Sequence, residues 1–461
     1  MRILQVLMLV LVPELLAWEI FHRGRHTGGN LVISGKKAVG FDDWDPSVTE
    51  HWFTQILDHF NPNDNRTWQQ RYFVNQEYYN SSYGGPVFLE IGGESEASKF
   101  LLRRGMMIDN AKKYGALCFE LEHRYYGDSH PTEDLSTENL EYLSVQQALA
   151  DLAEFISAMN EKYEFPPHTK WIAFGGSYSG SLAAWLRLKY PHLVHGAVSS
   201  SSVLAAKADY SDYFKIVADS LRTHSEECVR NVEIGTAEID VLLRRKNGAQ
   251  HLEQIFNLCD PLEDSLNNSK DISALFDVLA GQFADIVQYN KDNIKGRTIT
   301  IDTICKIMED QTWGSRVNRL AAVNKLIVSS YGYYCIPFKY RKLLSYFTET
   351  DWNSKAAIRG DRQWTFQTCT DLGLHSTSSH APHVFSHHFP VEYYFEQCVD
   401  IFGPKYNSSF SYSATKRTNS LYGALDINVS NVVFVHGSMD PWHQAGVTKT
   451  VNPASPVIYI E

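Results

Sequence analysis

Ser177 lies in the stretch GGSYSG, which runs from Gly175 to Gly180 and is rich in small residues. An apolar run, KWIAFGG, precedes Ser177, and a helical pattern follows it within two residues. A strand that turns so sharply into a helix holds the serine in strained backbone geometry and lifts its hydroxyl clear of the sheet. This arrangement is typical of a nucleophilic serine that forms a covalent acyl intermediate.

The neighbours of Ser177 are small, as such a corner requires. Gly175 and Gly176 precede it, and Ser179 and Gly180 follow it. The usual pattern G-x-S-x-G is therefore not met strictly, because Ser179 stands where the last glycine would be. A glycine-rich turn without chemistry is the alternative interpretation.

Two backbone amides are candidates for stabilising the oxyanion that forms when a serine attacks a carbonyl group. The N–H of Tyr178 lies at the start of the expected helix, where amides point at an anion. The second donor is expected in the loop LEIGGESE, through the amide of Gly93 or Glu94. These two glycines before Glu94 could equally form a simple turn.

An acid and a histidine are expected after the serine, in that order along the chain. Asp440 ends an apolar run in VVFVHGSMDPW, where Pro441 fixes the loop and Trp442 can exclude water. A plain Asp-Pro turn is the alternative. No histidine follows His443 in this sequence. We expect neither His443 nor His436 to serve as the base, because His443 would have to reach Ser177 from the wrong side of the acid and His436 comes before the turn.

A histidine-rich stretch, HSTSSHAPHVFSHH, could suggest a metal site. Its spacings match no compact zinc pattern, so we predict a polar loop that gains charge at acidic pH, and no metal. The histidines of this stretch are His375, His380, His383, His387 and His388.

Strands and helices alternate around the serine in a way that predicts a parallel sheet. Short apolar strands are expected at Gly85–Gly93, Ala116–Arg124, Lys170–Gly176 and His195–Ser202, and a helix at Leu143–Met159. The region from 206 to 400 has helical periodicity and no convincing buried strand, and strand patterns resume near Asn431. The fold class expected is α/β, with an inserted helical cap.

Five segments follow from this pattern. Residues 1–17 are expected to be a signal peptide, too short and too interrupted to span a bilayer. Residues 18–49 are expected to form a loose leader. Residues 50–205 and 401–461 are expected to build the sheet domain, with 206–400 as the cap.

Composition points to a lumenal or secreted protein. The formal net charge of −11 argues against a nucleic-acid partner, and no later segment could cross a membrane. Seven cysteines, six of them in the predicted cap, should pair in an oxidising compartment and leave one without a partner. Five N-x-S/T triplets are expected to be glycosylated, at Asn65, Asn80, Asn267, Asn407 and Asn428.

Several stretches together resemble one family of serine peptidases. They are EHRYYGDS (Glu122–Ser129), GGSYSGSLAAWLRLKYP (Gly175–Pro191), WTFQTCTDLG (Trp364–Gly373) and HGSMDPWH (His436–His443). The family is that of lysosomal Pro-Xaa carboxypeptidase, dipeptidyl peptidase 2 and thymus-specific serine protease. The resemblance spans nearly the whole chain after the leader.

The resemblance implies an α/β-hydrolase domain with a helical cap, Ser177 as nucleophile and Asp440 as acid. It also implies exopeptidase action on short peptides, often next to proline, in acidic vesicles and without a cofactor. In the family the triad histidine lies beyond the position of Glu461, in a loop that also carries a cysteine. We therefore expect the 461-residue chain to be C-terminally incomplete and catalytically impaired.

Two other functions remain open at this point. One is a carboxyl-ester hydrolase on the same fold, and the other is a catalytically inactive homologue that binds peptides. The sequence decides neither between carboxypeptidase and dipeptidyl peptidase action nor the oligomeric state, for which a homodimer is one alternative.

Overall fold

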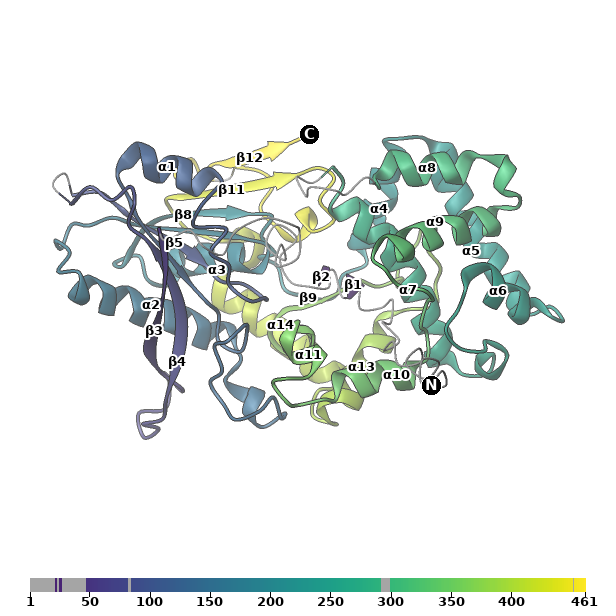
Figure 1. The fold of residues 1–461 in the computed structure, drawn as a ribbon, viewed down its shortest axis with the longest axis horizontal. Helices are drawn as coiled ribbons and strands as arrows, with labels where there is room; N and C mark the ends of the chain where they lie inside the picture. The colour runs from purple at the N-terminus through teal and green to yellow at the C-terminus, as the bar shows by residue number, and fades with distance from the viewer. Residues whose placement is uncertain (1–20, 23–24, 27–46, 82–83, 292–298, 451) are drawn as a thin grey trace, which may run out of the picture.

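The computed structural model describes residues 21–22, 25–26, 47–81, 84–291, 299–450 and 452–461 (Figure 1). The predicted signal peptide, 1–17, and most of the predicted leader, 18–49, lie outside the described residues. Within that leader, two short strands pair in antiparallel fashion, β1 (Phe21–His22) and β2 (Arg25–His26).

The described residues form an eight-stranded sheet in the order β12-β11-β8-β7-β5-β6-β4-β3. Strand β4 runs antiparallel to both of its neighbours, and the other neighbouring pairs are parallel. This strand order and direction confirm the predicted α/β-hydrolase fold. The strands are β3 (Val48–Ile56), β4 (Thr67–Asn75), β5 (Val87–Ile91), β6 (Leu117–Leu121), β7 (Trp171–Gly176), β8 (Val194–Ser200), β11 (Val432–Gly437) and β12 (Val457–Ile460).

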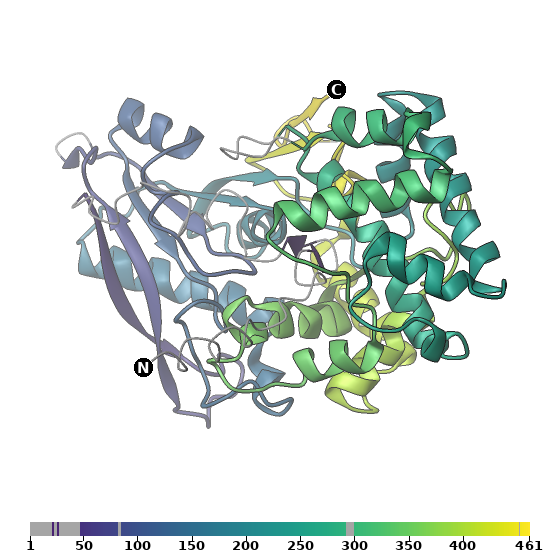
Figure 2. The ribbon, with the colours of Figure 1, turned by 45° about the vertical axis from the view of Figure 1, so that its right-hand side comes forward.

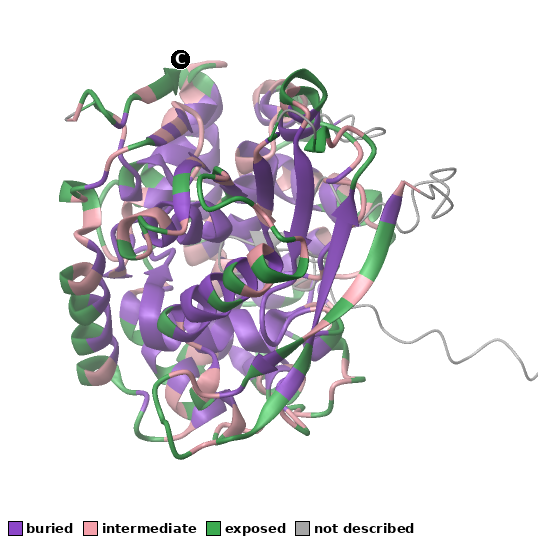
Figure 3. Cartoon of the chain, turned by 90° about the vertical axis from the view of Figure 1, so that its left-hand side faces the viewer, coloured by how far each residue is buried: buried purple, intermediate pink, exposed green. Residues whose placement is uncertain are grey.

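Helices cover both faces of this sheet. Helix α1 (Met106–Tyr114) packs on one face, and α2 (Val145–Lys162) and α3 (Tyr178–Lys189) pack on the other. Central strands are therefore buried on both sides, which explains why they are short apolar runs in the sequence (Figure 3). The edge strands β3 and β12 keep exposed positions.

The segment between β8 and β11 is mainly helical and lies beside the sheet (Figures 1 and 2). It differs from the prediction in one respect, because two short strands, β9 (Lys207–Asp209) and β10 (Gly373–His375), pair in parallel within it. Three-residue strands carry too little pattern to be recognised in a sequence. The helices are α4 (Asp212–Arg222), α5 (Glu226–Leu243), α6 (Gly248–Phe256), α7 (Ser269–Gln288), α8 (Ile301–Glu309), α9 (Arg316–Ser330), α10 (Tyr340–Phe347), α11 (Lys355–Ile358), α12 (Asp361–Gln367), α13 (Val391–Phe402) and α14 (Ser408–Tyr422).

The predicted boundary between residues 400 and 401 falls inside α13. Helix α14, which follows it, stacks Tyr422 on Trp185 of α3, with ring centroids 4.6 Å apart. A division at residue 400 would therefore cut a helix, and the boundaries of the cap stay a prediction.

Six of the seven cysteines pair within the helical segment, as Cys228–Cys305, Cys259–Cys335 and Cys369–Cys398. The seventh, Cys118, is free and buried in β6. Burial raises the pKa of its thiol to about 12, so it is chemically unreactive there. Cys118 lies under α1, five strands away from β12 in the sheet.

The described residues bear on two predictions, membrane spans and glycosylation. No helix in the described part of the chain is both long and apolar enough to cross a bilayer. Each asparagine of the five N-x-S/T triplets is exposed, at positions Asn65, Asn80, Asn267, Asn407 and Asn428, so glycosylation at them stays a prediction.

Candidate active site

Ser177 occupies the sharp corner that the sequence predicts, between the last residue of β7 and the first residue of α3. Its backbone has φ 58° and ψ −128°, a conformation that residues other than glycine rarely adopt. The N–H of Ser177 donates to the carbonyl oxygen of Ser200 at 2.9 Å, which ties the corner to β8. A Cβ at Gly175 would lie 2.2 Å from the carbonyl oxygen of Ser179, so only glycine fits there, whereas Gly176 has open space.

The first residue of the helix, Tyr178, is fully buried. Its hydroxyl lies 3.1 Å from Nε2 of His123, a buried residue from the loop after β6. Burial lowers the pKa of His123 to about 4, so this imidazole is neutral. The side chain thus anchors the helix start while its amide stands in the first turn, where N–H groups have no acceptor within the helix.

The loop after β5 lies directly against this corner. A Cβ built at Gly93 would stand 3.4 Å from Cβ of Ser179. The Glu94 side chain reaches Ser177, whose hydroxyl donates to Glu94 Oε1 at 3.4 Å. The sequence predicts a role only for the amide of Glu94, so the contact between its carboxylate and the serine is an addition from the structure.

Two buried carboxylates anchor the same loop from below. Glu122 accepts the amide of Ala97 at 3.0 Å, and Glu120 accepts the amide of Ser98 at 3.0 Å. Burial raises the pKa of Glu122 to about 6, against the opposing effect of the Arg71 guanidinium, and raises that of Glu120 well above its usual range. Charged residues inside the apolar run CFELEHR are the sequence signal that could have revealed this anchoring.

Strand register brings Ser177 and Asp440 to the same edge of the sheet. Gly176 of β7 pairs with Ser200 of β8, and Ser200 pairs with Val435 of β11. Ser177 and Asp440 follow strands that are two strand spacings apart, or about 10 Å at the usual separation. The order of strands therefore gathers two residues that are far apart in the chain.

One oxygen of the Asp440 carboxylate accepts a backbone hydrogen bond. Its Oδ1 accepts the amide of Trp442 at 2.9 Å. Its Oδ2 is buried and has no hydrogen-bond partner among the described residues. Burial raises the pKa of Asp440 to about 6, opposed by the Trp442 amide and the Ser201 hydroxyl. Trp442 is itself buried and stacks on Tyr210, as the prediction that it excludes water requires.

Neither histidine near Asp440 has the contacts of a catalytic base in the structure. Nδ1–H of His443 donates to the backbone carbonyl of Asp440 at 2.7 Å, and Gln444 lies 3.1 Å from its Nε2. The His436 ring is buried against Gly446, and neither ring nitrogen has a hydrogen-bond partner among the described residues. Burial lowers its pKa to about 4.

Comparison with known protein families matches residues 55–461 to the family described as serine carboxypeptidase S28. The chain belongs to the S28 family. A Caenorhabditis elegans protein named as a serine protease is 35% identical over 445 residues, which cover 93% of this chain and 85% of that protein. The thymus-specific serine protease of Mus musculus is 34% identical (89% and 80% covered), and the lysosomal Pro-X carboxypeptidase of Bos taurus is 28% identical (95% and 83% covered).

Membership of the S28 family confirms the family resemblance that the motifs predict and establishes a serine peptidase lineage. The roles of individual residues rest on the geometry described above. The histidine-rich stretch begins at His375, the last residue of β10, and ends in the loop before α13.

Proposed function

We propose that this protein is a lumenal serine exopeptidase that hydrolyses short peptides, with Ser177 as nucleophile and Asp440 as the acid of its triad. The observation that carries the proposal is the strained, partly exposed Ser177 at the same sheet edge as the buried Asp440 carboxylate. The three disulfides support a location in the secretory pathway. A relative whose name places it in the lysosome supports the lysosome as one such location.

In this mechanism the Ser177 hydroxyl oxygen attacks the peptide carbonyl carbon, and its proton passes to a histidine. The amides of Tyr178 and of Gly93 or Glu94 stabilise the tetrahedral oxyanion. The C–N bond then breaks, the histidine protonates the leaving amine, and water hydrolyses the acyl-enzyme. No cofactor takes part in these steps.

The unpaired Oδ2 of Asp440 is the acceptor that such a histidine needs for its Nδ1–H. Strand β12 runs parallel to β11, with Ile460 opposite Gly437. A histidine on a segment after Ile460 would therefore emerge at the edge that holds Asp440. We propose this position for the base, because His443 contacts the backbone carbonyl of Asp440 and His436 packs against Gly446.

Substrate choice is proposed from the relatives. One of them is named for Pro-X carboxypeptidase action, so peptides with proline next to the cleaved bond are the substrates to test first. The helices beside the sheet would restrict access to peptide ends. Glu94, beside Ser177, places a carboxylate where a bound peptide must pass.

The test uses the protein and forms that extend it past Glu461, each assayed with proline-containing peptides, aryl esters and a fluorophosphonate probe. We expect an extended form to hydrolyse the peptides and to be labelled at Ser177, and Ser177→Ala to lose on the order of 10⁶-fold in kcat. Hydrolysis of esters alone would refute the peptidase assignment. Peptide binding without labelling would favour an inactive binding protein.

A further inference from the structure

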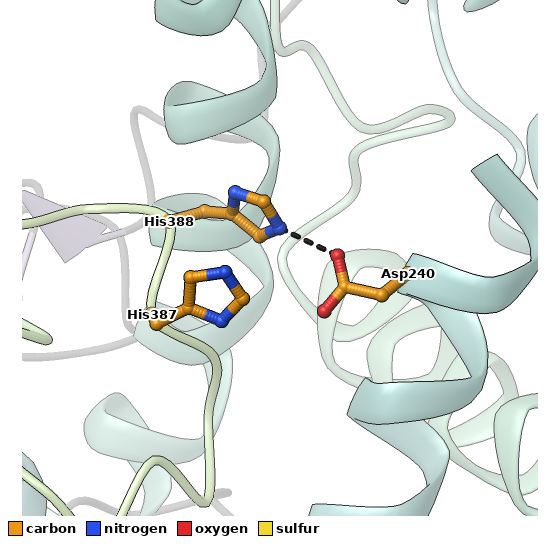
Figure 4. Close-up of side chains that lie close together, drawn as sticks. All are labelled: Asp240, His387 and His388. Atoms are coloured by element: carbon orange, nitrogen blue, oxygen red, sulfur yellow. Dashed lines mark hydrogen bonds and ion pairs between the residues drawn. The ribbon is translucent and has the colours of Figure 1, made fainter. Parts of the chain in front are cut away.

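Three metal-ligating side chains from distant parts of the helical segment meet at its surface (Figure 4). Asp240 lies near the end of α5, and His387 and His388 are consecutive in the loop before α13. One ligand atom of each residue lies within 4.8 Å of the others. Nε2 of His388 stands 2.5 Å from Oδ1 of Asp240, and the two imidazole centroids are 4.3 Å apart.

The backbone and the ring of His388 are held by contacts that need no ion. Ser386 has φ 109°, a strained value for a residue with a side chain, and its hydroxyl accepts the His388 amide at 3.1 Å. The hydroxyl of Ser273 on α7 donates to the His388 carbonyl at 2.5 Å. The His388 ring also stacks on Phe276, with centroids 4.5 Å apart. A ligand fixed in this way loses little freedom when an ion binds.

The cluster opens onto a pocket of about 580 Å³. This volume accommodates an ion together with its water ligands. Two cations line the pocket, but Lys270 already pairs with Glu396 at 3.2 Å and with Asp400 at 2.7 Å. Arg244 is the cation that opposes a bound ion, while Glu392 and Asp240 favour it.

Two imidazole nitrogens and one carboxylate oxygen form a donor set that suits zinc rather than calcium or magnesium, which prefer oxygen ligands only. We propose that Asp240, His387 and His388 bind a zinc ion that ties the loop between β10 and α13 to α5. Zinc takes such ligands at about 2.0–2.2 Å, so in the bound state it replaces the hydrogen bond between His388 and Asp240. Water completes the tetrahedral coordination.

The spacing of the histidines alone matches no zinc pattern and predicts no metal here. The third ligand is 147 positions before His387 in the chain, counted as 387 minus 240, so no local motif contains it. Only the packing of α5 against this loop unites the three residues.

The test titrates the full, chelator-treated protein with zinc chloride by calorimetry at pH 7.5. Calcium and magnesium chlorides are titrated in parallel. We expect a zinc site that neither calcium nor magnesium fills. His388→Asn and Asp240→Asn should each weaken that site by at least about 100-fold, because even partners of metal ligands contribute 10–100-fold.

The matched control is His380→Asn, which removes a histidine of the same loop whose Nδ1 lies 2.9 Å from the Ser211 hydroxyl, outside the cluster. It should leave the site intact. Since the chain contains 18 histidines, the comparison of His388→Asn with His380→Asn separates this site from adventitious zinc. Equal zinc affinity in the wild type and His388→Asn, or no zinc binding by the wild type, would overturn the proposal and leave a simple His–Asp ion pair.

A second measurement covers the case in which His388→Asn does not fold. Asp240→Asn keeps the size of a partly exposed side chain, and zinc should raise the melting temperature of the wild type but not of this variant. An equal rise in both would also contradict the proposal.

Discussion

The sheet and the helical segment between β8 and β11 are held together by different means. In the sheet, strand register alone brings Ser177 and Asp440 to one edge, and no disulfide touches any of its strands in the described residues. The helical segment contains three disulfides that close sequence separations of 77, 76 and 29 residues. The proposed chemistry therefore lies in the part of the molecule that the hydrogen bonds between strands position without any cross-link.

The largest effect that should separate the two regions is the loss of a cross-link. Replacing Cys228 and Cys305 by serine removes a bridge across 77 residues, which should lower the free energy of unfolding by about 2–5 kcal/mol. Chemical denaturation followed by near-ultraviolet circular dichroism measures the loss. Replacing Cys369 and Cys398, which close only 29 residues, should cost about 1 kcal/mol less by loop entropy. A larger loss for the shorter bridge would contradict this reasoning.

An intermediate effect is expected at the corner of the sheet. Gly175→Ala places a Cβ 2.2 Å from a backbone oxygen, so strand and helix must move apart. Such overpacking costs about 1–3 kcal/mol, and in a form extended past Glu461 the displaced Ser177 should react far more slowly with a fluorophosphonate. Gly176→Ala is the matched control, since its Cβ would meet no atom within 4 Å. If both variants reacted at the wild-type rate, the corner would not need its glycine.

The smallest effect concerns pH. The pKa of Asp440 is about 6 in the folded protein against 3.8 ordinarily, so the folded protein holds this proton more tightly than the unfolded chain. The resulting stabilisation is present at low pH and is lost as the pH rises through 6, by about 1 kcal/mol between pH 5 and pH 7.5. Asp440→Asn should remove this part of the decline in thermal stability. An identical pH dependence in the variant would show that the carboxylate is ionised throughout.

Much of the sheet could be predicted, because parallel strands buried on both faces leave short apolar runs separated by helical patterns. The corner at Ser177 could be predicted for a similar reason, since small residues must surround it. Side-chain contacts between distant segments could not, among them Glu94 with Ser177 and Asp240 with His388. The cysteine count predicted one unpaired thiol, but only three-dimensional packing identifies it as Cys118.

The burial of Cys118 makes the reaction of its thiol a measure of how often the sheet opens. Its thiol can meet an alkylating reagent only when β6 separates from its neighbours, because the strand is covered on both faces. Reductants, by contrast, act on the bridges of the helical segment. The rate at which the native protein takes up one alkyl group therefore counts openings of the sheet, independently of the state of the other six cysteines.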